Sequence, residues 1–128
     1  MKKTKVKILL LEDNPIHREV LFDGLEDAGY EVRKARNADA ADKILEEFKP
    51  DLFLFDIVIE NIKSAGYQFA KKLRTNPEFQ SVPVLFISAH MDIMHKEKIF
   101  PPDSNEHTLK KPFDFDQLFK KIGEVLKT

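Results

Sequence analysis

The stretch LFLFDI, Leu52–Ile57, decides the fold because it ends an apolar run with an aspartate. Four apolar residues in succession predict a strand that is covered on both faces, as in a parallel sheet. An unpaired buried carboxylate is costly or shifts its pKa. Asp56 must therefore lie at the lip of the core or have a neighbour that compensates its charge, and its position at a strand end favours the lip.

Short apolar runs alternate with helical patterns on both sides of this stretch. We expect strands at Val6–Leu11, Tyr30–Ala35, Asp51–Phe55 and Val82–Ile87, with a brief fifth strand at Thr108 and Leu109. We expect helices after the caps Asn14 and Asn37, over Ala65–Arg74, from Asp92 to about Ile99, and after Asp114 with Gln117 in a capping box. Five such units predict an α/β fold, a doubly wound five-stranded parallel sheet flanked by five helices.

Length and composition limit the classes of function. The 128 residues suit one domain, the net charge is −1, and there is no cysteine. Near neutrality gives no sign of direct nucleic-acid binding, and no apolar run is long enough to span a membrane. The absence of cysteine fits a reducing compartment, so we expect a cytoplasmic protein.

Polar residues follow the predicted strands at their carboxyl ends, where a doubly wound sheet binds ligands. They are Glu12, Asp13, Asp56, Ser88 and Lys111. Like charges about 4 Å apart repel by about 4 kcal/mol at an effective dielectric near 20, which protonation or a cation would relieve. Oxygen ligands favour a hard ion such as Mg²⁺. A lysine and a hydroxyl beside an acidic metal site predict phosphoryl transfer to a carboxylate.

Four motifs carry a resemblance to a known family. They are ILLLEDN with Glu12 and Asp13, PDLFLFDI with Asp56, VPVLFISA with Ser88, and KKPF with Lys111. In this order and spacing the chain resembles the receiver domains of two-component response regulators, the CheY-like superfamily. The resemblance covers residues 1–128 as a single receiver domain and implies the strand order 2-1-3-4-5.

The resemblance implies roles for the acids. Asp56 would accept a phosphoryl group from a phosphohistidine of a sensor histidine kinase or a histidine phosphotransfer protein. Glu12, Asp13, Asp56 and the main-chain carbonyl of Val58 would hold Mg²⁺. The chain would then be a signalling domain that switches its contacts with an unknown downstream protein or a fused output domain, and not an enzyme with a diffusible substrate.

The resemblance also assigns the two other polar residues. Lys111 would pair with the acyl phosphate, and the Lys111–Pro112 peptide bond would be cis, as in relatives. Ser88 would swing toward the phosphate and report its presence.

The sequence departs from the family pattern in three segments. Glu60 stands where relatives usually have a proline, in a slightly longer loop, and FPPDSNEH (100–107) replaces a small Gly-Ala pair. Thr108 stands where relatives often carry an aromatic ring, so a ring rotation there cannot be the readout. His90, two residues after Ser88, is a candidate for tuning the lifetime of the phosphate together with Val58.

Two other functions compete with the phosphoacceptor hypothesis. A pseudo-receiver would bind protein partners without taking phosphate, and the altered switch region leaves this possibility open. An aspartyl-phosphate phosphatase would commonly carry a second aspartate two positions after the nucleophile, where this chain has Val58. A nucleotide-binding function is not supported, because the sequence has no glycine-rich loop after the first predicted strand.

Overall fold

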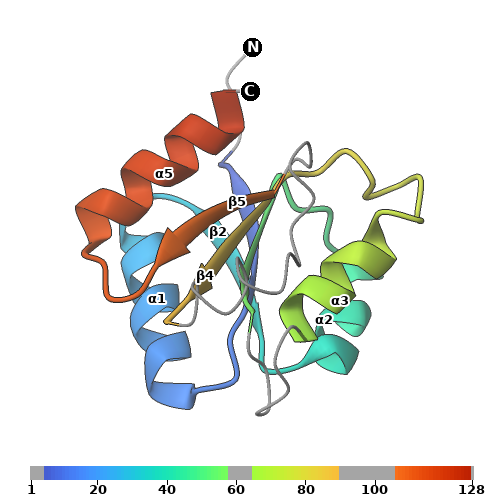
Figure 1. Cartoon of the computed structure of the whole chain (residues 1–128), viewed down its shortest axis with the longest axis horizontal. Helices are drawn as coiled ribbons and strands as arrows, with labels where there is room; N and C mark the ends of the chain where they lie inside the picture. Colours follow the sequence, from blue (N-terminus) through green and yellow to red (C-terminus); the bar gives the residue numbers. More distant parts are fainter. Residues whose placement is uncertain (1–4, 58–64, 90–105, 128) are drawn as a thin grey trace.

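The computed structural model describes residues 5–57, 65–89 and 106–127, and these form one sheet with helices on both faces (Figure 1). The strands are β1 (Lys7–Leu11), β2 (Glu31–Ala35), β3 (Leu52–Asp56), β4 (Val84–Ser88) and β5 (Glu106–Lys110). The described helices are α1 (Pro15–Asp27), α2 (Ala38–Leu45), α3 (Ala65–Leu73) and α5 (Phe115–Lys127). The expected helix from Asp92 to Ile99 lies outside the described residues.

The five strands are parallel and lie in the order β2-β1-β3-β4-β5, which confirms the predicted fold class and order. The chain leaves β1 toward β2 on one side and later returns to β3 on the other. The strand order therefore reverses between β1 and β3, and the carboxyl ends of these two neighbours form the edge where such sheets bind ligands.

Two apolar layers cover the sheet, as expected for strands that are apolar on both faces. Helices α1 and α5 cover one face, and α2 and α3 cover the other (Figure 1). Along β1 the side chains alternate between the layers, with Leu9 and Leu11 in the α2–α3 layer and Ile8 and Leu10 in the α1–α5 layer. Every residue of β3 and β4 is buried.

The predicted caps hold the helix ends. The Asn14 side chain accepts hydrogen bonds from the main-chain N–H groups of Ile16 and His17, both at 3.0 Å, and so begins α1. Asp114 and Gln117 form the expected capping box, with both main-chain to side-chain bonds at 2.8 Å.

Several element boundaries differ from the prediction, most of them by one residue and more at α2, β4 and β5. The sequence places Phe48 on the inner side of the second helix and predicts that Pro50 closes it. Helix α2 instead ends at Leu45 because the next N–H groups bond three residues back instead of four, although Phe48 still packs in the core. Strand β4 begins after Pro83, which has no N–H to give to a ladder. Strand β5 is as long as the other four, so it is not brief.

Candidate functional site

The three predicted acids gather at the carboxyl edge of the sheet. Glu12 and Asp13 directly follow β1, and Asp56 ends the adjacent strand β3. Each has a carboxylate oxygen within 4.8 Å of those of the other two. The acidic cluster, as we call Glu12, Asp13 and Asp56, thus brings together residues from two separate parts of the chain.

Asp56 lies at the end of β3 as expected, but it is buried there and not exposed. The residue is only 7% exposed, and Glu12 is 1% exposed. The compensation comes from Lys111, whose Nζ lies 3.0 Å from Asp56 Oδ2. Of the two explanations that the sequence left open, a paired and buried carboxylate is the one observed.

Lys111 joins both ends of the acidic cluster. Its Nζ also donates to Glu12 Oε1 at 2.9 Å, so one ammonium group bridges two buried carboxylates. Its main-chain N–H donates to the carbonyl of Ser88 at 2.9 Å, which ties the end of β5 to the end of β4. The peptide bond to Pro112 is cis, as the resemblance implied.

Lys111 offsets only part of the cost of burying these like charges together. Burial, followed by the negative charge of Asp56, raises the pKa of Glu12, and the hydrogen bond from Lys111 only partly offsets both. Burial acts to lower the pKa of Lys111, but the charges of Asp56 and Glu12 outweigh it and the pKa is raised. The lysine is therefore held in its charged form, while Glu12 is easier to protonate than an ordinary glutamate.

Ser88 lies one strand away from the nucleophile candidate. It ends β4, is 1% exposed, and follows Ile87, which is in register with Asp56. Thr108 lies on β5 in register with Phe86 and is half-buried. Val58, Glu60 and His90, which the sequence also singled out, lie outside the described residues.

The donor set fits a hard divalent cation. Three carboxylates offer one oxygen each from nearby positions, and no histidine or cysteine belongs to the cluster in the described chain. Mg²⁺ prefers oxygen ligands, commonly one or two carboxylates together with waters. The acidic cluster is therefore compatible with the predicted Mg²⁺ site.

Two residues that contact the site were missed from the sequence. Arg18, on α1, donates from Nη1 to the carbonyls of Glu12 and Asp13 at 3.1 and 3.3 Å. Gly66, at the start of α3, lies so close to the Asp56 carbonyl that a Cβ would collide with it. The signal available for Gly66 was a glycine at the start of the helix that follows the strand ending at Asp56. An arginine one turn into a helix gives no such signal.

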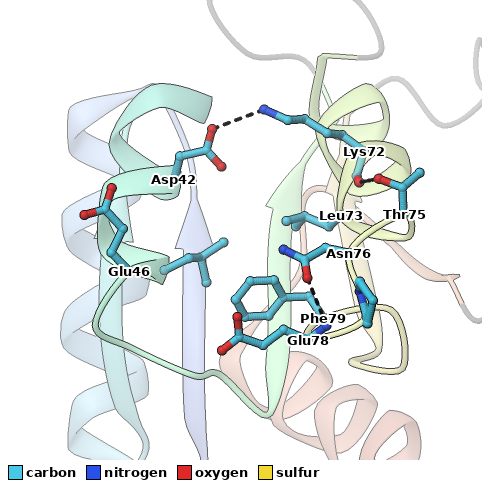
Figure 2. A pocket seen from close by; sticks show the side chains of 10 residues that line it. Asp42, Glu46, Lys72, Leu73, Thr75, Asn76, Glu78 and Phe79 are labelled. Carbon is cyan, nitrogen blue, oxygen red and sulfur yellow. Dashed lines mark hydrogen bonds and ion pairs between the residues drawn. The ribbon is translucent and has the colours of Figure 1, made fainter.

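A groove of about 530 Å³ also opens between α2 and α3 (Figure 2). It lies at the C-terminal ends of these helices, hence at the opposite sheet edge from the acidic cluster. Its rim carries an ion pair between Asp42 and Lys72 at 3.4 Å, and the Asn76 side chain accepts the main-chain N–H of Glu78 at 2.9 Å. The ion pair links the two helices, and the Asn76 bond lies within the turn that follows α3.

No helix among the described residues has the length and apolar character needed to cross a bilayer.

Residues 8–123 match the family described as the response regulator receiver domain. The response regulator Rre1 of a Synechocystis strain is 37% identical over 123 residues, which cover 94% of this chain and 52% of Rre1. Protein PilH of Pseudomonas aeruginosa is 29% identical over 121 residues, which cover 94% of this chain and 97% of PilH. This chain therefore spans about half the length of Rre1 and nearly all of PilH.

A solved structure supports the fold independently. The receiver domain of sensor histidine kinase PA1611 from P. aeruginosa, with a magnesium ion coordinated in its active-site cleft, aligns with a TM-score of 0.82. The alignment covers 98% of this chain and 100% of that domain at 24% identity. This likeness shows the same fold. The match over residues 8–123 shows that the chain belongs to the response regulator receiver domain family of two-component systems.

Proposed function

We propose that the chain is the phosphoacceptor domain of a two-component phosphorelay, in which Asp56 takes a phosphoryl group from a phosphohistidine. The observation that carries this proposal is the bridge from Lys111 to Asp56 and Glu12, at 3.0 and 2.9 Å, inside a cluster of three carboxylates. A potential nucleophile, a fixed cation and a metal site then share one buried pocket.

The transfer requires one bond to form and one to break. An Asp56 carboxylate oxygen attacks the phosphorus, the phosphorus–nitrogen bond breaks, and the imidazole keeps the electron pair and takes up a proton. Lys111 is close enough to Asp56 to donate to a phosphoryl oxygen on the new acyl phosphate. The Ser88 hydroxyl, at the adjacent strand end, would donate to another.

Mg²⁺ would be held by Glu12, Asp13 and Asp56, together with the main-chain carbonyl of Val58. When bound, the ion neutralises charge on the phosphoryl oxygens. The convergence of three carboxylate oxygens supports this assignment, and so does the magnesium ion in the PA1611 receiver domain. This chain's own contribution is to hold the three acids together against their mutual repulsion.

The surface beside Lys111 suits a protein phosphodonor. Ile16 and Val20 on α1 are 72% and 53% exposed, although both are large and apolar. Val20 also lines a hollow of about 250 Å³ together with Pro112 and Phe113. An apolar patch next to the site favours docking of a sensor histidine kinase or histidine phosphotransfer protein over a diffusible substrate.

The output would be a change of contacts with a downstream protein or a fused output domain, within the cytoplasm. With Thr108 in place of an aromatic ring, we propose that movement of Ser88 is transmitted without ring rotation. NMR spectra with and without the phosphate mimic beryllofluoride test this: shifts confined to residues near Asp56, with none along β5, would contradict it.

The decisive experiment is phosphorylation with a small donor. Wild type and Asp56→Asn are incubated with acetyl phosphate and Mg²⁺, and their intact masses are measured. We expect a phosphoryl-sized gain in wild type only. No mass gain in wild type at saturating donor and metal would favour a pseudo-receiver. An equal gain in both proteins would show that a residue other than Asp56 is the acceptor.

A further inference from the structure

One arginine side chain holds two successive carbonyls of the loop that carries two of the acids. Arg18 Nη1 donates to the carbonyl oxygens of Glu12 and Asp13 at 3.1 and 3.3 Å. The main-chain N–H of Arg18 donates to the carbonyl of Asn14 at 2.8 Å. The arginine is half-buried and belongs to α1, so the loop is attached directly to a helix of the scaffold.

The other side of this loop is attached to the sheet. The main-chain N–H of Glu12 donates to the carbonyl of Ala35 at the end of β2, at 3.0 Å. The main-chain N–H of Asn14 donates to Glu12 Oε2 at 3.2 Å, which also restrains the Glu12 side chain. Arg18 thus supplies the helix-side restraint and β2 supplies the sheet-side restraint.

Such restraint has a physical purpose, because the loop carries like charges. Glu12 and Asp13 face Asp56 with oxygens within 4.8 Å, and repulsion would push a free loop away from β3. Lys111 relieves the repulsion from the carboxylate side. Arg18 acts from the main-chain side, because its planar and permanently charged guanidinium donates to the carbonyls of Glu12 and Asp13.

We propose that Arg18 is a positioning residue for the acidic cluster, which sets its affinity for a divalent cation by holding the peptide bonds of Glu12 and Asp13. The inference rests on the proposed function only in its choice of Mg²⁺ as the ion. Residues that orient metal ligands typically change metal affinity by about 10- to 100-fold when removed. Arg18→Met should therefore weaken Mg²⁺ binding by about tenfold.

The chain offers a closely matched control in Arg74. This half-buried arginine also donates from Nη1 to two loop carbonyls, those of Val82 at 3.0 Å and Gln80 at 3.5 Å. Its loop follows α3 and leads into β4, at the sheet edge opposite to the acidic cluster. Arg74→Met therefore removes a similar set of hydrogen bonds without touching the site.

The test measures Mg²⁺ dissociation constants by calorimetric titration of the unphosphorylated full chain, with thermal melts to verify folding. We expect a tenfold increase in Arg18→Met, a change within twofold in Arg74→Met, and an intermediate value in Arg18→Lys, which keeps the charge but not the planar fork. Hydrogen exchange of the Glu12 and Asn14 amides, measured without metal, should be faster in Arg18→Met only.

Each alternative outcome is informative. Equal dissociation constants in wild type and Arg18→Met would overturn the inference and leave the proposed function intact. Equal losses of Mg²⁺ affinity in Arg18→Met and Arg74→Met would show that Arg18 contributes only to general stability. A wild-type Mg²⁺ affinity in Arg18→Lys would show that the positive charge, and not the positioning of the loop, is what matters. A wild-type chain that binds no Mg²⁺ would overturn the proposed metal site and this inference together.

Discussion

Replacing Lys111 by methionine removes the cation that bridges two buried carboxylates. Each contact, at 2.9 and 3.0 Å, corresponds to a gross attraction of about 5 to 6 kcal/mol at an effective dielectric near 20. Desolvation cancels much of this, and breaking a buried pair typically costs about 3 to 5 kcal/mol. Because the lysine side chain is 19% exposed, the lower end applies, and we expect a loss of about 3 kcal/mol.

This loss should depend on pH in a defined direction. The pKa of Glu12 is raised in the folded protein, so the folded state takes up this proton at a higher pH than the unfolded chain does. The stability that Glu12 contributes is complete below its ordinary pKa of 4.5 and is lost as the pH rises through the folded value. Without Lys111 the repulsion between Glu12 and Asp56 is larger. Acidification from neutral pH should therefore reduce the difference in free energy of unfolding between Lys111→Met and wild type.

Urea denaturation in metal-free buffer at neutral pH and at about pH 5 measures both effects. Lys110→Met is the control, because Lys110 is exposed and adjacent in sequence. Mg²⁺ at 100 times its dissociation constant should add about 2.7 kcal/mol to a variant that still binds it. A free energy of unfolding within 0.5 kcal/mol of wild type (roughly the range of ordinary surface substitutions) would refute the reasoning.

Three further predictions concern glycines and Glu12. Gly66→Ala places a Cβ against main-chain atoms at the end of β3, which cannot yield like a side chain, so we expect a loss of about 3 kcal/mol in urea denaturation and slower phosphorylation by acetyl phosphate. In Gly24→Ala the atoms nearest to the new Cβ belong to the ring of Phe115, and the better helix propensity of alanine offsets part of the strain, so we expect a net loss of about 1 kcal/mol by the same assay. Gly123→Ala, with open space around it, should stabilise the fold. Equal effects at positions 24 and 66 would contradict this ranking. Mg²⁺ affinity should fall as the pH is lowered toward the raised pKa of Glu12. Calorimetric titrations of Glu12→Gln should show weaker Mg²⁺ binding that depends less on pH. If the affinity of this variant changed with pH as much as that of wild type, Glu12 would be excluded as the group whose proton competes with the ion.

The fold could be predicted from the sequence because its signals are local. Continuous apolar runs gave the buried strands, and Asn14 and Asp114 marked helix starts through hydrogen bonds within four residues. Predicted element boundaries were wrong where a proline or a tightened turn ended the element earlier or started it later than the apolar pattern indicates. Pro83 shortened the fourth strand, and the turn after Leu45 tightened while Phe48 remained in the core.

The site could be predicted only in part, because its restraints are long-range. Strand-end position was enough to gather Glu12, Asp13 and Asp56, since parallel strands end at one edge. Burial of Asp56 was not predictable, because it depends on how a lysine 55 residues away packs against it. The contacts of Arg18 with two carbonyls likewise depend on the angle at which α1 leaves the sheet.

The balance of charge in the pocket links these restraints to the proposed chemistry. The formal charges of three carboxylates and one ammonium group sum to −3 + 1 = −2. A phosphoryl group that enters such a pocket is repelled, and its transfer converts the single charge of Asp56 into the greater charge of an acyl phosphate. A divalent cation brings the sum to −2 + 2 = 0 before the transfer, whereas protonation of the acids would also disable the nucleophile. The restraints from Lys111 and Arg18 therefore do more than stabilise the fold, because they hold the carboxylates close together, as a shared divalent ion requires.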